Sequence, residues 1–265
     1  MLRPRITPCL LVHKGGLVKT VGFKAPKYVG DPINAVKIFN EKEADELVVL
    51  DIDATANNAE PDYRMIANLA AECRMPLCYG GGIKTPEQAK RIIGLGVEKI
   101  AISSAAIENP ELITRIADDI GRQSVVVVLD VRKRMLSKDY DVVIKNASNN
   151  TKRSVFDLAA EAEKLGAGEL VINSIDRDGA MTGYDLALAD RIRHAVKIPI
   201  TILGGAGTMS DLEALIRSCG VIGASAGSLF VFKGVYKAVL INYPTLAQRE
   251  ELIRKALHET GAGLN

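Results

Sequence analysis

The sequence contains no tryptophan, and only 5% of its 265 residues are aromatic. A core built by this chain must therefore be packed mainly from aliphatic side chains, which a hydrophobic share of 48% can supply. Valine, isoleucine and leucine are the residues that fill sheets of parallel strands covered on both faces. The scarcity of aromatic residues therefore favours an α/β architecture with a parallel sheet.

The chain also lacks an excess of charge of either sign, since 34 basic and 32 acidic residues leave a net charge of +2. This balance gives no electrostatic case for a nucleic-acid or anionic-membrane partner. No apolar stretch approaches the roughly 18 residues that a membrane span needs, and the first residues lack the apolar core of a signal peptide. We therefore expect a cytoplasmic protein that binds neither nucleic acid nor membrane.

Cysteine is scarce, and Cys9, Cys73, Cys78 and Cys219 do not have the spacing of metal ligands. Two of them, Cys9 and Cys78, lie inside apolar runs, so we expect reduced core residues. The sequence also lacks a nucleophile elbow, a Walker loop and a dinucleotide fingerprint. It therefore predicts no metal and no cofactor, and favours acid–base chemistry over covalent, metal or redox chemistry.

Eight short apolar runs alternate with longer amphipathic stretches along the chain. Runs this short and this rich in Val, Ile and Leu are typical of strands buried on both faces. Eight strand-then-helix units predict either a (β/α)8 barrel or a doubly wound sheet. The expected strands are Cys9–Val12, Leu47–Leu50, Pro76–Tyr79, Lys99–Ile102, Ser124–Leu129, Leu170–Ile172, Pro199–Leu203 and Gly220–Ser225.

Helical patterns fill the stretches between these runs. One polar segment, Tyr140–Arg153, breaks the alternation, and we expect an exposed excursion there, with a hairpin as one interpretation. The expected helices are Pro32–Asn40, Tyr63–Cys73, Thr85–Leu95, Pro110–Ile120, Val155–Leu165, Asp185–His194 and Ser210–Cys219, with Lys233–Asn242 and Thr245–His258 at the end.

An internal repeat favours the barrel over the open sheet. Gly80–Gly82 has an echo at Gly204–Gly207, and Ser103–Ala106 has one near Gly227–Leu229, each about 123 residues later. Two equal four-unit halves close naturally into a ring, whereas an open sheet has no reason to repeat in this way. The sequence therefore predicts one TIM barrel domain over residues 1–265, built as two half-barrels, at a length typical of this fold.

The loops after the strands are where such barrels carry their active sites. Glycine lets the backbone point N–H groups at an anion, and hydroxyl and N–H groups at a helix start complete a phosphate site. One glycine turn alone is equally well explained by tight packing, but two, each followed by a serine-bearing turn one strand later, predict a substrate with a phosphate at each end. The candidate residues are Gly81, Gly82, Ser103 and Ser104 in the first half, and Gly204, Gly205, Gly227 and Ser228 in the second.

Carboxylates also follow several of the expected strands. Asp130 ends the fifth strand, which favours a catalytic or substrate-orienting role over an internal ion pair. For Asp178, followed by Gly179, capping of the loop and contact with substrate are equally plausible. His13 and Lys19 are further candidate substrate contacts, although Lys19 is also a possible structural partner of Asp51.

Several motifs along the chain are distinctive, and the most specific is Ile175–Gly179 followed by Gly183–Asp185. The others are Pro8–Leu10, Gly30–Pro32, Asp45–Leu47, Gly80–Ile83 and Ala106–Pro110. Together they resemble the cyclase subunit of imidazole glycerol phosphate synthase, the HisF family, and the resemblance extends from about residue 3 to 258. The related isomerase that acts one step earlier in histidine synthesis shares the barrel and phosphate sites but resembles the most specific motif less.

The resemblance implies a glutaminase partner of the HisH type, which docks on the lower face of the barrel as a heterodimer. Its ammonia would pass through the barrel to a phosphorylated small molecule at the opposite mouth. The family's inner gate is a ring of two basic and two acidic residues, and the alternative is a plain ion-pair cluster that closes the barrel floor. The matching positions are Arg5, Glu46, Lys99 and Glu169.

The catalytic pair of the family consists of two aspartates, and only one of them is present here. Asp130 matches the second, but Leu11 stands where the family has the first, and leucine cannot accept or donate a proton. Further departures, among them Asn173 in place of threonine, fall at the same end of the barrel, whereas the gate positions keep their residue types.

Two functions follow from this pattern. The chain can be an ordinary cyclase (a lyase) of histidine biosynthesis, with Asp130 working alone or helped by His13. It can instead be a specialised relative that supplies ammonia, with a separate sugar amidotransferase, for acetamidino modification in lipopolysaccharide or other surface-polysaccharide biosynthesis. The altered pair with an intact gate favours the specialised function, and a phosphoribosyl isomerase-type barrel is a third interpretation.

Overall fold

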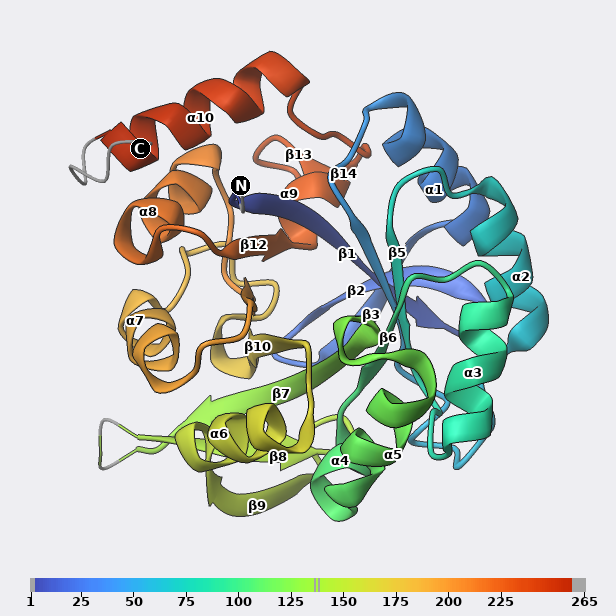
Figure 1. Ribbon diagram of the computed structural model, residues 1–265. Helices are drawn as coiled ribbons and strands as arrows, with labels where there is room; N and C mark the ends of the chain where they lie inside the picture. Colours follow the sequence, from blue (N-terminus) through green and yellow to red (C-terminus); the bar gives the residue numbers. More distant parts are fainter. Residues whose placement is uncertain (1–2, 136, 138, 259–265) are drawn as a thin grey trace.

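A closed ring of parallel strands forms the centre of the computed structural model, which describes residues 3–135, 137 and 139–258 (Figure 1). Strand β10 pairs with β7 on one side and β11 on the other, and β12 pairs with β1, so the ring has no free edge. The predicted barrel is confirmed. Its strands are β1 (Arg5–His13), β4 (Leu47–Asp51), β5 (Leu77–Gly80), β6 (Lys99–Ile102), β7 (Val125–Lys133), β10 (Glu169–Ser174), β11 (Ile200–Leu203) and β12 (Gly223–Ala226).

Helices surround the ring, and their apolar faces pack on its outer surface (Figure 1). Capping boxes begin α3 and α8, at Thr85 with Gln88 and at Thr208 with Asp211, so the second of these helices starts near the predicted Ser210. The helices are α1 (Pro32–Glu41), α2 (Tyr63–Glu72), α3 (Pro86–Gly94), α5 (Glu111–Ile120), α6 (Val155–Leu165), α7 (Leu186–Ala195), α8 (Met209–Cys219) and α10 (Leu246–His258), with the short α4 (Ser104–Glu108), α9 (Ser228–Val231), η1 (Arg122–Ser124) and η2 (Ile175–Arg177).

The two halves of the barrel repeat each other in backbone detail. Gly81 has a φ of +129°, and a Cβ there would lie 2.6 Å from the carbonyl oxygen of Asp51. Gly204 has a φ of +97°, and a Cβ there would lie 2.6 Å from the carbonyl oxygen of Ser174. Glycine is therefore required at both turns for the same two reasons, close approach of another strand and a left-handed backbone.

Small and aliphatic side chains fill the inside of the ring. All four cysteines are free, and Cys9 and Cys78 are buried in this interior, as the sequence predicted. The interior cluster forms a predominantly apolar column between the two ends of the barrel. Its members are Cys9, Val48, Cys78, Ala101, Val126, Val128, Val171 and Leu203, with Leu11 and Leu50 packed against it.

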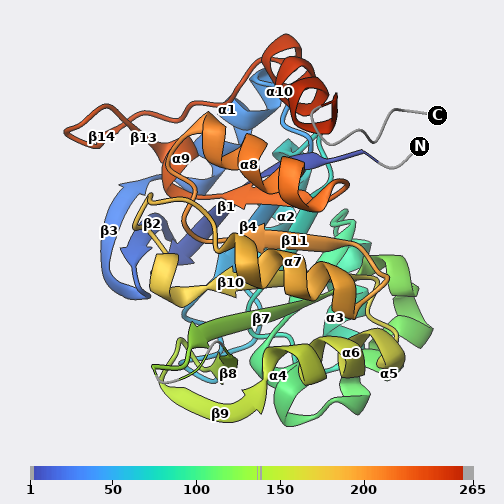
Figure 2. The ribbon, with the colours of Figure 1, turned by 90° about the vertical axis from the view of Figure 1, so that its left-hand side faces the viewer.

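Two hairpins interrupt the alternation of strands and helices. The sequence did not predict the first, β2 (Gly16–Val21) with β3 (Lys24–Gly30), which follows β1. The second, β8 (Tyr140–Ile144) with β9 (Asn149–Ser154), confirms a hairpin within the predicted excursion, but β8 is buried rather than exposed. Figure 2 shows both hairpins on the side of the barrel opposite the start of β1.

The prediction of a helix over Lys233–Asn242 is wrong. The segment forms a small hairpin, β13 (Phe232–Lys233) with β14 (Ala238–Val239). Gly234 and Lys237 have φ values of +73° and +48°, so the chain reverses where a helix would need a right-handed backbone. The final helix is present as α10, and no helix in the described ranges is long and apolar enough to cross a membrane.

Candidate functional site

A cavity of ≈ 230 Å³ opens at the C-terminal ends of the barrel strands. Of the predicted phosphate, substrate and catalytic positions, all but His13 line it, so the structure brings together residues from nearly the whole length of the chain. The predicted residues that line the cavity are Leu11, Lys19, Gly81, Gly82, Ser103, Ser104, Asp130, Asp178, Gly179, Gly204, Gly205, Gly227 and Ser228.

The two candidate phosphate sites lie across the mouth from each other. One joins the turns after β5 and β6, and the other joins the turns after β11 and β12, which occupy opposite positions in the ring. In the first, the Ser104 hydroxyl already accepts a hydrogen bond of 3.0 Å from the backbone N–H of Lys145 in the β8–β9 hairpin. Their separation across the cavity fits a substrate with an anionic group at each end.

Lys19 extends from β2 into the second of these sites. Its side chain is buried, and Nζ donates a hydrogen bond of 2.7 Å to the carbonyl oxygen of Cys9. A Cβ at Gly227 would collide with Nζ, so this glycine leaves the space that the ammonium group occupies. Burial lowers the pKa of Lys19, against the opposing pull of Cys9 and Asp178.

Lys19 does not pair with Asp51, which corrects one of the structural alternatives. The Asp51 carboxylate instead accepts backbone hydrogen bonds of 2.9 Å from Asp53 and 3.2 Å from Ala54. Asp51 therefore caps the turn after β4. The buried amino group of Lys19 has no ion pair within the described residues.

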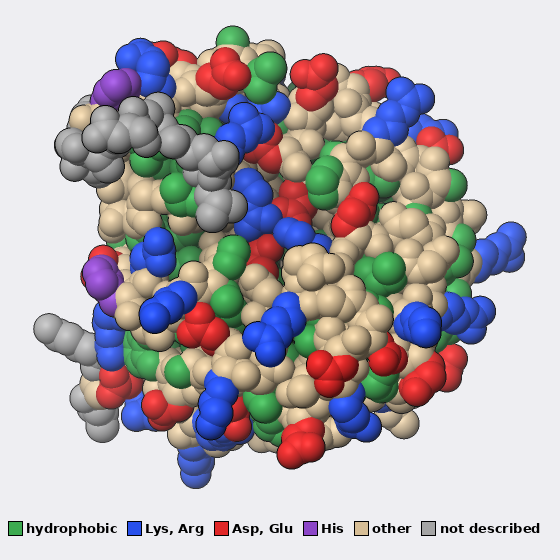
Figure 3. Space-filling view, in the orientation of Figure 1, with side chains coloured by type: hydrophobic (Ala, Val, Ile, Leu, Met, Phe, Trp, Pro, Cys, Tyr) green, Lys and Arg blue, Asp and Glu red, His purple; other side chains and the backbone are tan. Residues whose placement is uncertain are grey.

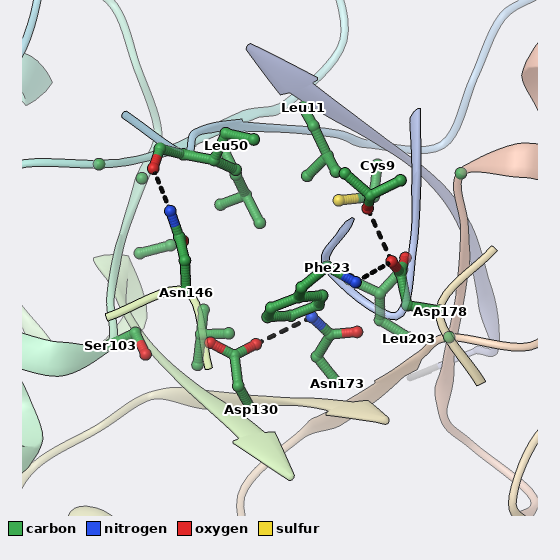
Figure 4. Close-up of a pocket in the computed structure, with 18 of the residues that line it drawn as sticks. Cys9, Leu11, Phe23, Leu50, Ser103, Asp130, Asn146, Asn173, Asp178 and Leu203 are labelled. Carbon is green, nitrogen blue, oxygen red and sulfur yellow. Dashed lines mark hydrogen bonds between the residues drawn. The ribbon is translucent and has the colours of Figure 1, made fainter. Parts of the chain in front are cut away.

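Asp130 lies at the upper end of β7, inside the cavity (Figure 4). Its Oδ1 accepts a hydrogen bond of 2.9 Å from Nδ2 of Asn173, on the neighbouring strand β10. Burial raises the pKa of Asp130 to about 6, although hydrogen bonds from Asn173 and Ser103 oppose the rise. At neutral pH the group is therefore mostly an ionised carboxylate that can take up a proton.

Leucine side chains occupy the side of the cavity opposite Asp130 (Figure 4). Leu11 on β1 lies in register with Leu50 on β4, and both pack against the interior cluster. No titratable side chain comes from this position of β1, so Asp130 has no partner carboxylate across the mouth there. The asymmetry that the sequence indicated is thus present in the cavity itself.

Asp178 anchors the β2–β3 hairpin to the barrel. Its carboxylate accepts hydrogen bonds of 2.7 Å from the Thr20 hydroxyl and 3.0 Å from the N–H of Phe23. The loop-capping role that the sequence suggested is therefore present, on the hairpin rather than on its own turn. A contact of Asp178 with substrate stays a prediction.

His13 is placed outside the cavity lining. Its Nδ1 lies 2.7 Å from Oδ1 of Asp53, and the other oxygen of Asp53 accepts a hydrogen bond from the N–H of Lys14. The imidazole therefore joins the end of β1 to the turn after β4. Its predicted contact with substrate has no support in this geometry.

The four predicted gate residues form a closed ring at the lower end of the barrel. Arg5 lies 2.6 Å from Glu46 and 2.6 Å from Glu169, and Lys99 lies 2.7 Å and 2.9 Å from the same two carboxylates. Thr201 adds a hydrogen bond of 2.7 Å to Glu169. Figure 3 views the molecule as in Figure 1 and shows basic and acidic side chains gathered at the centre of this face.

The four side chains of the ring are buried enough that the charge of each affects the pKa of its neighbours. The side chains of Glu46 and Glu169 are 6% and 8% exposed, and those of Arg5 and Lys99 are 26% and 20% exposed. Burial alone would raise the pKa of Glu169, but Arg5 and Lys99 outweigh it and hold that pKa below its usual value. Burial alone would likewise lower the pKa of Lys99, but the two carboxylates raise it. The ring therefore favours the charged forms of Glu169 and Lys99.

Several side chains that line the cavity were not predicted as site residues, among them Asn173, Phe23 and Asn146. Phe23 enters it from the turn of the β2–β3 hairpin, and Asn146 enters from the β8–β9 hairpin, where its Nδ2 donates a hydrogen bond of 2.6 Å to the carbonyl oxygen of Ile52. Both residues sit at hairpin turns with φ values of +63° and +52°. The Gly-Phe and Lys-Asn-Ala turns were the only local signal for them.

A sequence profile for the family described as histidine biosynthesis protein matches residues 5–237. A Leptospira borgpetersenii protein, provisionally named imidazole glycerol phosphate synthase subunit HisF, is 57% identical over 252 residues, or 95% of this chain and 99% of the relative. A Pseudomonas aeruginosa protein, provisionally named subunit hisF2 of the same synthase, is 53% identical over 244 residues, or 92% and 97%. Imidazole glycerol phosphate synthase subunit HisF of Lactococcus lactis is 41% identical over 230 residues, or 87% and 89%.

Proposed function

The chain belongs to the HisF family of histidine biosynthesis proteins, and on that premise we propose that it is the cyclase subunit of an imidazole glycerol phosphate synthase. In this function a glutaminase of the HisH type docks on the lower face and releases ammonia. The ammonia passes the charged ring, crosses the barrel and reacts at the upper mouth with an aminoimidazole-carboxamide ribonucleotide precursor.

The observation that supports this most is the position of the charged ring and the cavity at opposite ends of one interior. The apolar column between them suits a small neutral molecule, whereas an ammonium ion would lose its hydration there without compensation. The ring of Arg5, Glu46, Lys99 and Glu169 would then act as the entrance, at which ammonium can leave its proton behind.

The cavity supports a substrate with two phosphates. Gly81 and Gly204 bring backbone N–H groups to opposite sides of the mouth, and Lys19 holds a buried positive charge beside Gly227. Each phosphate would accept backbone hydrogen bonds at one of the two candidate phosphate sites. The phosphate bound between the turns after β11 and β12 would also be the counter-charge for Lys19.

Asp130 is the residue for proton transfer. With a pKa of about 6, its carboxylate is a base near neutral pH and can return the proton later in the reaction. Leu11 cannot share this role because it offers no proton, and His13 is paired with Asp53 outside the cavity lining.

A second candidate function rests on this same missing carboxylate. In the specialised function, the barrel conducts ammonia toward a separate sugar amidotransferase that forms an acetamidino group of a surface polysaccharide. Leu11 and the intact ring favour it, because conduction needs the ring but not a pair of acids. The relatives described above bear the name of the histidine enzyme, which is why we place the cyclase first.

One experiment separates the two functions. The purified chain is given the ribonucleotide precursor and ammonium chloride at alkaline pH, and formation of the imidazole product is followed. The cyclase function predicts saturable turnover that the Asp130→Asn substitution abolishes. The specialised function predicts almost none in the wild type.

The Leu11→Asp variant serves as the matched comparison. If the chain is a cyclase limited by its missing acid, restoring aspartate raises turnover by about 10²-fold or more, within the range of acid–base contributions. Absence of product from both proteins, with both folded, would exclude the cyclase.

A further inference from the structure

Asn173 carries a buried polar atom without a partner. The residue is 6% exposed and lines the cavity, yet no protein group within the described residues hydrogen-bonds to its side-chain oxygen Oδ1. Buried acceptors are nearly always satisfied, so an unsatisfied one in a cavity indicates a missing donor.

The neighbours of Asn173 fix which way its amide points. An ionised carboxylate can accept hydrogen bonds but not donate them. Asp130 therefore accepts from Nδ2 of Asn173 at 2.9 Å, and Oδ1 of Asn173 points away from it (Figure 4). On the other side Asn173 lies in register with Leu203, which has no polar side-chain atom. The amide therefore presents a fixed acceptor beside the carboxylate.

The missing donor must be small, since Oδ1 is shielded from the solvent at the mouth. Asn173 stands on the same strand as Glu169 of the charged ring, with only Val171 between them among the inward-facing residues. A molecule that rises through the interior along β10 therefore passes Val171 and then meets Asn173, with Asp130 hydrogen-bonded beside it.

We infer that Asn173 is a positioning residue for ammonia arriving through the barrel. Oδ1 accepts one N–H of ammonia and the Asp130 carboxylate accepts another, which leaves the nitrogen lone pair free to face a substrate above. The inference rests on the proposed function only in assuming that ammonia enters the barrel, and it holds for the cyclase and the specialised function alike.

Ammonia binding is measured without turnover by nuclear magnetic resonance. The chain is labelled with ¹³C at the asparagine side-chain carbonyls, and the Asn173 signal is identified by its loss in Asn173→Leu. We expect a saturable shift of this signal with ammonium chloride at alkaline pH, and none with sodium chloride or the bulkier trimethylammonium chloride. An Asn173 signal that ignores ammonia overturns the inference.

Kinetics supply the second test. Asn173→Leu keeps the shape of the side chain, and we expect the apparent KM for ammonia to rise about tenfold while the KM for the precursor stays within about twofold. The matched control is Asn34→Leu, which makes the same change at an exposed position of helix α1 outside the cavity and should leave both KM values unchanged. An unchanged KM for ammonia in Asn173→Leu also overturns the inference.

The two proposals can fail separately. A wild-type chain whose Asn173 signal responds to ammonia but which does not convert the precursor would exclude the cyclase and support the positioning role. A wild-type chain that converts the precursor but whose Asn173 signal does not respond to ammonia would support the cyclase and exclude the positioning role.

Discussion

Removing one carboxylate from the charged ring should destabilise the barrel far more than removing an exposed one. Glu169→Gln keeps the shape of the side chain but leaves Arg5 and Lys99 with only Glu46 between them. Breaking a buried ion pair by deleting one partner costs about 3–5 kcal/mol. Because the two cations are 26% and 20% exposed, water offsets part of this, and we expect a loss of about 2–3 kcal/mol.

Urea unfolding followed by circular dichroism measures this loss as a change in the free energy of unfolding. The matched control is Glu251→Gln, which removes a carboxylate that pairs with Arg254 and Lys255 on the exposed face of α10 and should change stability far less. The double variant Glu169→Gln with Lys99→Met restores charge balance, leaving Arg5 with Glu46, and should recover most of the loss.

The effect should also depend on pH. The pKa of Glu169 is lower in the folded chain than its usual 4.5, so its contribution is complete above that value and disappears as pH falls through the folded pKa. The difference between the wild type and Glu169→Gln should therefore shrink below about pH 4.5. A loss equal to that of the exposed control, or a double variant that shows the sum of two independent losses, would refute the coupled ring.

Two further predictions concern the upper end of the barrel. The pKa of Asp130 is raised to about 6, and its ionised form is the base, so kcat/KM for ammonia-dependent turnover should rise with pH through about 6. The Asp130→Asn variant should lose this rise with pH and should lower kcat/KM by about 10²–10⁴-fold. Gly81→Ala and Gly204→Ala should each cost more than about 2 kcal/mol in urea unfolding, by similar amounts, because each Cβ meets a backbone oxygen at 2.6 Å; Gly94→Ala, in helix α3 with open space around it, should be neutral or stabilising.

The barrel was predictable because each strand is a short apolar run with a repeat of the same signals in the second half. Gly81 and Gly204 are required for the same reason half a barrel apart, which is the physical basis of the repeat that the sequence shows. The cavity followed from the rule that the turns after the strands converge. Of the residues predicted to act in catalysis or to bind phosphate or substrate, all but His13 line the cavity. A residue's position after a strand fixes the end of the barrel at which it lies.

The errors have local causes. Lys233–Asn242 contains enough apolar residues to imitate a helical face, but Gly234 and Lys237 take left-handed backbones that turn it into a hairpin. The β2–β3 hairpin was missed because its outer strand is exposed and carries no alternating pattern. Pairs such as His13 with Asp53 join the end of one strand to the turn after another, which sequence spacing does not reveal.

The two ends of the barrel differ in how their residues affect stability and in which step of the reaction they serve. Buried ion pairs contribute little net stability compared with apolar residues of the same volume, so a ring of four charges is a poor way to close a barrel floor unless the charges have another use. At the upper end, Leu11 is compatible with an apolar wall and relieves the chain of a second buried carboxylate near Asp130. A barrel that conducts ammonia needs the ring in any case, whereas only a barrel that also closes the imidazole needs proton transfer at the mouth. Variants of Glu169 therefore test conduction and variants of Leu11 test cyclisation, and a chain that depends on the first but gains nothing from the second would be a conduit rather than a cyclase.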